Sequence, residues 1–174
     1  MKNGIEDLSS YLEILFQTEN RIAEIVMKSG LRFSTNKMTA DLGEFYAFET
    51  LSKSENLFVS IEQQKNSNSE FDLLGKLASH SILLEHFGKK EIRIEVKTRR
   101  NQEGVKYLGS LKPQKFELLC VVDLAKNYKL NMIYLVKSET ASEFLDRKYH
   151  RLIFNDRMAF MTIDKNSIAT ISKV

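Results

Sequence analysis

The sequence contains very few of the residues on which special structures depend. Its 174 residues include 1 cysteine, 1 proline, 7 glycines and no tryptophan. A single cysteine forms no internal disulfide, which excludes a disulfide-stapled secreted scaffold and favours a reducing compartment. No apolar run is longer than residues 118–122, and a membrane-spanning helix needs ~20. The first residues turn acidic where a signal peptide turns apolar. We therefore expect a cytoplasmic protein.

The composition is that of an ordinary globular domain, with 43% hydrophobic and 28% charged residues. The net charge of +3 is unevenly distributed. The segment from Lys89 to Lys115 has nine basic and three acidic residues, so it carries +6 and the remainder of the chain −3. This segment is either a face that binds a polyanion or a solvated, lysine-rich surface.

Hydrophobic periodicity predicts one mixed α/β domain. Three- and four-residue steps predict a helix over 5–28, and a second helix is expected over 38–53. Pro113 suits the first turn of a short helix over 113–117, and Ser138 is the expected N-cap of a helix over 139–147. Strands are predicted over 57–61, 71–77, 91–98, 118–124, 131–136 and 158–164. Residues 80–88 fit either a strand continuation or a short apolar connection. We expect residues 1–36 to form a helical extension packed on a core of residues 37–174.

The predicted strand over 91–98 carries the first candidate for chemistry. Glu95 and Lys97 are two residues apart, so both side chains project from the same face of the strand. A carboxylate in this position binds a hard cation such as Mg²⁺, and the lysine orients a water or neutralises charge on a phosphate. The alternative is a salt bridge on the outer face of a half-exposed strand, without catalytic meaning.

Two further carboxylates accompany this pair. Asp72 interrupts the apolar segment one strand earlier, and an antiparallel hairpin would bring it to Glu95; the alternative is a turn aspartate. Glu44 falls among small and apolar residues on its predicted helix, so it faces the interior or a cleft and needs a partner. A metal ion or Lys97 would provide one, and a plain helix-to-sheet salt bridge is the alternative.

In this order, the helical glutamate, the aspartate and the Glu-Val-Lys strand resemble the PD-(D/E)XK nuclease superfamily. The resemblance covers roughly residues 38–137 and implies a restriction-endonuclease-like αβββαβ core, with a mixed sheet flanked by helices and an additional N-terminal helix. It implies that Asp72, Glu95 and the Val96 carbonyl bind Mg²⁺, for which Mn²⁺ substitutes. Glu44 would complete the site, and Lys97 would be the catalytic base or the group that orients the water.

The sequence departs from the superfamily pattern at two points. Phe71 stands where the pattern has a proline. The gap between Asp72 and Glu95 is long and contains the apolar residues around Leu83. If this insertion is helical, the argument for a simple hairpin weakens.

The resemblance implies a magnesium-dependent DNA endonuclease, of type II restriction or genome-defence kind. A repair or junction-resolving nuclease that reads DNA shape, and a non-catalytic nucleic-acid-binding module, are the alternatives. Basic residues beyond the active-site strand would grip the DNA backbone: Arg99, Arg100, Lys106, Lys112 and Lys115. The helix over 5–28 would cap the sheet or pair with a second copy in a homodimer.

Overall fold

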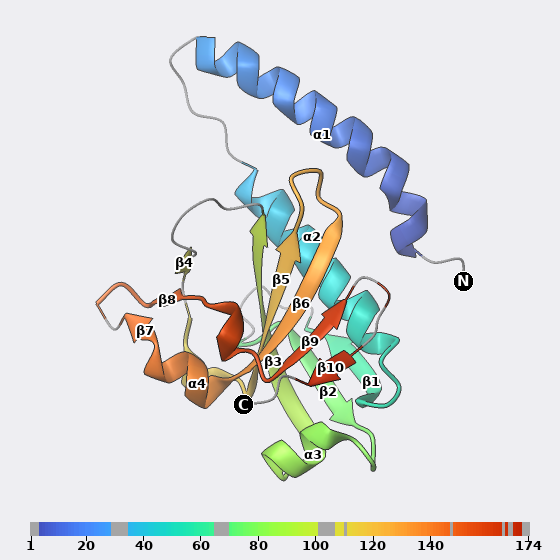
Figure 1. Ribbon diagram of the computed structural model, residues 1–174, viewed down its shortest axis with the longest axis vertical. Helices are drawn as coiled ribbons and strands as arrows, with labels where there is room; N and C mark the ends of the chain where they lie inside the picture. Colours follow the sequence, from blue (N-terminus) through green and yellow to red (C-terminus); the bar gives the residue numbers. More distant parts are fainter. Residues whose placement is uncertain are drawn as a thin grey trace.

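The computed structural model describes residues 4–28, 35–64, 70–100, 107–109, 111–146, 148–164, 166 and 169–171. The fold is mixed α/β, as the periodicity predicted, with a curled seven-stranded sheet and helices on it (Figure 1). Among these residues, no helix is both long and apolar enough to cross a membrane.

The main sheet has the strand order β1-β2-β3-β5-β6-β9-β10. Its strands are β1 (Phe58–Gln63), β2 (Leu73–Leu77), β3 (Glu91–Arg100), β5 (Leu118–Leu124), β6 (Leu130–Lys137), β9 (Met161–Asp164) and β10 (Ala169–Ile171). Neighbouring strands pair antiparallel except for β3 and β5, which pair in parallel from Ile94 opposite Leu118 to Arg100 opposite Leu124. All six predicted strands are confirmed, with shifted ends.

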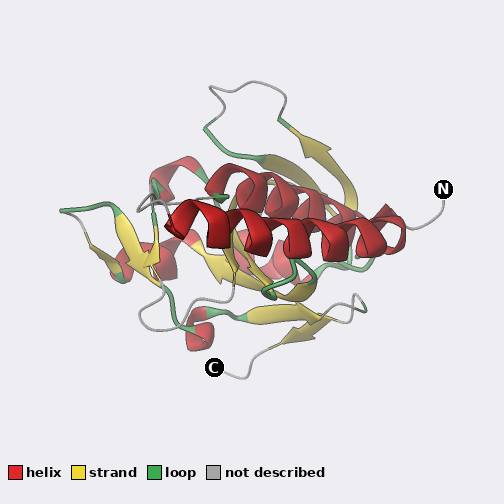
Figure 2. Cartoon of the chain, turned by 90° about the horizontal axis from the view of Figure 1, so that it is seen from above, coloured by secondary structure: helices red, strands yellow, loops and turns green. Residues whose placement is uncertain are grey.

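Helices lie on both faces of the sheet. The helical segments are α1 (Gly4–Lys28), α2 (Asn36–Ser52), α3 (Ile82–Phe87), α4 (Ser138–Glu143) and two single 3₁₀ turns at Pro113–Lys115 and Asp156–Met158. The helix α2 packs on one face, against β1, β3 and β5, and the short α4 packs on the other. The helix α1 runs antiparallel beside α2 as the outermost element (Figures 1 and 2).

The sheet separates two hydrophobic cores, and β5 contributes to both. Cys120 and Val122 belong to the core under α2, whereas Leu119 and Val121 belong to the core on the other face. This explains why 118–122 is continuously apolar, because a strand covered on both faces has no solvated side. Cys120 is fully buried, as a small core residue.

A second, three-stranded sheet closes the opposite face. It is formed by β4 (Tyr107–Leu108), β8 (Arg151–Ile153) and β7 (Leu145–Asp146), in that order. The sequence did not predict it, since strands of two or three residues are too short to show a period. The predicted helix over 139–147 is shorter than expected and ends at Glu143, because the chain then enters β7.

The uncertain segment 80–88 contains the helix α3. The Ser81 side chain accepts a hydrogen bond from the Leu83 N–H at its start, and Gly88 ends it with φ of 61°, a value that favours glycine. The strands β2 and β3 nevertheless pair antiparallel, from Leu73 opposite Ile94 onwards. A helical insertion is therefore compatible with the hairpin that brings Asp72 to β3.

The close approach of α2 to β3 depends on Gly43. A Cβ atom at this position would lie 1.7 Å from Thr98 Oγ1 and 2.7 Å from Thr98 Cβ. Neither atom is the end of a flexible side chain, because Thr98 is β-branched and held on a strand. Gly43 therefore sets the height of α2 above the strand and, with it, the position of Glu44.

We expect Gly43→Ala to lower the free energy of unfolding by about 1–3 kcal/mol, because overpacking costs more than the ~1 kcal/mol that alanine gains in helix propensity. Denaturant unfolding of the variant measures the change. Thr98→Ala in the same chain removes the nearest clashing atom and is expected to restore part of the loss. A Gly43→Ala variant more stable than the parent would contradict the close contact.

Candidate functional site

The candidate site lies where β2 and β3 separate. The last paired residues of this ladder are Leu73 and Ile94, and the Asp72 N–H donates to the Ile94 carbonyl at 3.0 Å. The Asp72 carboxylate then accepts a hydrogen bond from the Val96 N–H at 2.7 Å. The carboxylate thus occupies the position that the next residue of a continuing strand would take. This bond fixes Asp72 beside the Glu95–Val96 peptide, as the hairpin argument predicted.

Glu95 and Lys97 form an ion pair on β3. The Lys97 Nζ donates to Glu95 Oε1 at 2.6 Å, and both side chains are half-buried. Burial raises the pKa of Glu95, while the charge and hydrogen bond of Lys97 lower it and the charge of Asp72 raises it again. Asp72, Glu95 and Lys97 therefore act on one another electrostatically at one place in the fold.

Glu44 approaches the same place from α2 and is also half-buried. Burial raises the pKa of its carboxyl, and the charge of Asp72 raises it further. Asp41 and Glu95 act in the same direction, whereas Lys97 opposes them. The charges of Asp72, Glu95 and Lys97 thus all act on Glu44, which places its carboxyl within electrostatic range of the site on β2 and β3. Such an arrangement has an excess of negative charge that a cation would relieve.

The described residues include no group of three or more His, Cys, Asp or Glu side chains placed to hold a metal ion. A cation here would therefore depend on fewer carboxylates than the three predicted. One oxygen of Asp72 and one of Glu95 are already hydrogen-bonded, which leaves the second oxygen of each carboxylate as the donor set that fits a hard cation.

The two arginines that were predicted to grip DNA are engaged inside the protein. Arg99 is 3% exposed, and its guanidinium contacts Asp123 at 2.5 Å and Asp156 at 3.1 Å. Arg100 forms two hydrogen bonds with the Glu19 carboxylate, at 2.7 and 2.8 Å. Both guanidinium groups are therefore held by carboxylates of the protein and are not free to bind a DNA backbone.

The lysines are placed differently. Lys112 is exposed and lies close enough to Glu95 to lower its pKa against the effect of burial. Lys115 is partly exposed and pairs with Glu70. Lys106 lies outside the described residues. Among the described residues that were predicted to bind DNA, Lys112 combines an exposed side chain with a position near Glu95.

Sequence reasoning missed Glu19, which connects α1 to the sheet. Besides Arg100, its carboxylate accepts a hydrogen bond from Tyr128 Oη at 2.6 Å and one from Thr35 Oγ1 at 3.0 Å. Arg100 also stacks over the Tyr128 ring at 4.1 Å. A signal was present, because Glu19 falls on the same side of its helix as Leu12 and Leu15. Glu44 was predicted from a position of this kind, among the apolar residues of its helix.

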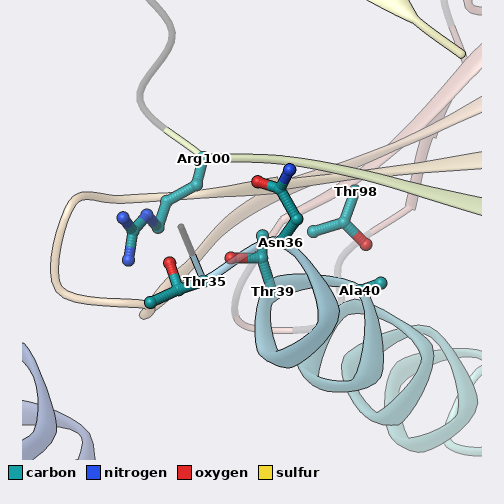
Figure 3. A pocket seen from close by; sticks show the side chains of 6 residues that line it. All are labelled: Thr35, Asn36, Thr39, Ala40, Thr98 and Arg100. Carbon is teal, nitrogen blue, oxygen red and sulfur yellow. The ribbon is translucent and has the colours of Figure 1, made fainter. Parts of the chain in front are cut away.

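A polar cavity of about 330 Å³ lies beside the start of α2. Figure 3 shows that its lining comes from the first turn of α2 and its capping residue on one side and from the end of β3 on the other. The lining residues are Thr35, Asn36, Thr39, Ala40, Thr98 and Arg100. This lining includes none of Glu44, Asp72, Glu95 and Lys97, so the cavity is separate from the candidate site.

Comparison with known proteins assigns no family to the chain. No protein-family model matches the chain, and no curated protein matches it. Among solved structures, the chain is similar to a bacterial homing endonuclease, with 10% sequence identity and a TM-score of 0.40, over 61% of this chain and 71% of that one. A similarity this weak does not assign a family, and the functional argument therefore depends on the site itself.

Proposed function

We propose that this protein is a magnesium-dependent DNA endonuclease whose active site is the cluster at the β2–β3 fork. The observation that carries the proposal is the fixed position of Asp72. Its carboxylate is hydrogen-bonded to the Val96 N–H, directly beside the Glu95–Lys97 ion pair. The aspartate, the glutamate and the lysine thus lie together where the two strands part, and their order along the chain is that of the PD-(D/E)XK superfamily.

In this proposal, Asp72 and Glu95, with the Val96 carbonyl, hold the divalent ion, and Glu44 supports them from α2. The ion supplies a Lewis acid for the scissile phosphate and lowers the pKa of a bound water. Mutual repulsion among the carboxyl groups makes cation binding favourable, because the cation offsets charges that burial otherwise destabilises.

The role proposed for Lys97 follows from its ion pair. Glu95 holds the ammonium at 2.6 Å, so Lys97 is fixed beside the place where the water and the phosphate meet. There it orients the attacking water as a base or hydrogen-bonding group and neutralises charge on the phosphate. Lys112, exposed near Glu95, provides a contact for the DNA backbone. Restriction or genome-defence biology, and a cytoplasmic location, remain part of the proposal on the strength of the resemblance and the composition alone.

The proposal is tested by plasmid cleavage. We expect supercoiled DNA to be nicked and linearised in Mg²⁺ or Mn²⁺ and to stay intact in excess EDTA, with products that carry 5′-phosphates. Asp72→Asn keeps an oxygen that accepts from the Val96 N–H but loses the charge, so it is expected to fold normally and to lose cleavage. Glu55→Gln, which removes an exposed carboxylate just beyond the end of α2, is the matched control and should cleave normally.

The outcomes separate the alternatives. Intact plasmid with every divalent ion, or full cleavage by Asp72→Asn, would refute the nuclease proposal. Fixed cut positions on linear duplex would favour a restriction enzyme, whereas cleavage confined to branched or mismatched DNA would favour a shape-reading nuclease. Salt-sensitive DNA binding without cleavage would favour a non-catalytic module.

A further inference from the structure

The apolar side chains of α1 fall in two neighbouring arcs, one that faces the core and one that is exposed. On its inner face Leu12 is buried, and Leu8 and Leu15 pack against the hydrophobic core. Glu19, on the same face, is bonded to Arg100. The inner face therefore attaches the helix to its own chain.

The outer face carries a line of exposed apolar side chains. Tyr11, Ile14, Ile22 and Ile25 are between 40% and 69% exposed. At ~100° per residue, these four and Thr18 fall within an arc of about 80°, and from Tyr11 to Ile25 they span about 21 Å. None of the five is charged. Scattered single hydrophobic residues are normal on a surface, but a continuous uncharged line of this length marks an interaction site.

The spacing of this line is symmetric. The steps from Tyr11 to Ile14, Thr18, Ile22 and Ile25 are three, four, four and three residues, so the pattern reads the same from both ends with Thr18 at its centre. A partner helix that lies antiparallel meets the pattern in reverse order. Antiparallel pairing about Thr18 therefore brings stripe residues of one copy opposite stripe residues of the other, in a two-fold symmetric contact.

We infer that the outer stripe of α1 (Tyr11, Ile14, Thr18, Ile22 and Ile25) is the contact surface for a second copy of this chain. In an antiparallel pair centred on Thr18, Tyr11 of each copy lies opposite Ile25 of the other, and Ile14 lies opposite Ile22. The Thr18 hydroxyl donates to the Ile14 carbonyl of its own helix at 2.8 Å. The centre of the contact therefore buries no hydroxyl without a partner.

The size of the stripe sets the strength of the contact. Its exposed side chains offer on the order of several hundred Å² of apolar surface per copy, below the ~800 Å² per partner of a standard stable interface. Small interfaces of this kind are reversible. The dimer is therefore expected to dissociate on dilution, with a dissociation constant in the micromolar range.

Sedimentation velocity on the full chain, from about 1 to 100 μM, tests the contact. The wild type is expected to shift from monomer to dimer over this range. Ile14→Glu, which places a charge in the stripe, is expected to stay monomeric with an unchanged circular dichroism spectrum and melting temperature. Val59→Glu alters an equally exposed apolar residue on β1, away from the stripe, and is expected to dimerise like the wild type.

The register is tested by cross-linking. In the antiparallel pair, residue 18 faces its own copy, so Thr18→Cys is expected to form a disulfide-linked dimer under mild oxidation by air and a copper catalyst. The sole native cysteine, Cys120, is buried and contributes no background. Asn20→Cys is the control, because residue 20 is exposed but lies on the opposite side of the helix from the stripe, and it is expected to cross-link far more slowly.

A wild type that is monomeric at every concentration would overturn the inference, and so would a dimer that Ile14→Glu leaves intact. Equal cross-linking of Thr18→Cys and Asn20→Cys would overturn the antiparallel register. These measurements report mass and disulfide formation and do not involve DNA. The inference therefore stands or fails independently of the proposed nuclease activity.

Discussion

Replacing Lys97 by methionine is expected to lower the rate of DNA cleavage by about 10²–10⁴-fold, the range that a positioned acid–base group contributes. Methionine preserves most of the side-chain volume and removes the ammonium that is bonded to Glu95. The variant leaves the half-buried Glu95 without its cation and is therefore expected to lose some stability, so circular dichroism is used to confirm that it is folded at the assay temperature. Single-turnover cleavage of a labelled duplex, compared with Lys90→Ala as an exposed control in the same basic segment, measures the effect.

Loss of Lys97 has a second consequence, which the experiment must separate. Burial raises the pKa of Glu95, and Lys97 is the largest influence that opposes this. Without the lysine, Glu95 holds its proton more strongly and binds a divalent ion less well. A titration with Mg²⁺ distinguishes the two effects, since a rate that recovers at saturating metal reflects binding alone.

Lys97→Arg completes this test. Arginine keeps the positive charge beside Glu95 but does not give up a proton at accessible pH. We expect it to restore metal affinity without restoring the rate at saturating Mg²⁺. If Lys97→Arg cleaves as fast as the parent chain, the lysine supplies only charge. If Lys97→Met also cleaves at the parent rate, the proposed role of Lys97 is wrong.

The sequence predicted best those features that depend on short-range periodicity. The alternation of Ile92, Ile94 and Val96 located β3, and the three- and four-residue steps of residues 5–28 located α1. The candidate site was predictable as a set of residue types, because its members lie on regular elements. Its detailed geometry was not predictable, because no local pattern shows that the Asp72 carboxylate accepts a hydrogen bond from the Val96 N–H.

The surroundings of β3 beyond Lys97 were not predictable either. The predicted strand ended at residue 98, so Arg99 was placed just beyond it and interpreted as a DNA contact, whereas β3 continues to Arg100 and alternation places Arg99 on the same face as Lys97. In the structure, this face is covered by Tyr134 and Phe154, whose rings lie 5.1 and 4.9 Å from the guanidinium carbon. Phe154 lies 55 residues further along the chain and directly follows β8, a three-residue strand of the small sheet. No pattern in the sequence around Arg99 predicts that these two rings cover it.

The burial of Arg99 leads to a prediction about stability. Arg99→Ala is expected to lower the free energy of unfolding by about 3 kcal/mol, because it leaves the partly buried Asp123 without its cation. It also removes the packing of the guanidinium on Tyr134 and Phe154. Since domains of this kind are stable by only ~5–15 kcal/mol, this loss should shift the midpoint of guanidinium unfolding clearly.

Matched variants decide between this structural role and the DNA contact predicted from sequence. Arg21→Ala breaks an ion pair with Glu24 in which both side chains are largely exposed, and it is expected to change stability by less than ~0.5 kcal/mol. Asp123→Asn with Arg99→Met removes both charges together and is expected to cost less than Arg99→Ala alone, because no buried charge is left unpaired. An unchanged unfolding midpoint for Arg99→Ala, together with weaker DNA binding, would show instead that the guanidinium acts at the surface. The measured unfolding midpoint therefore shows whether Arg99, near the end of β3, stabilises the fold or binds DNA.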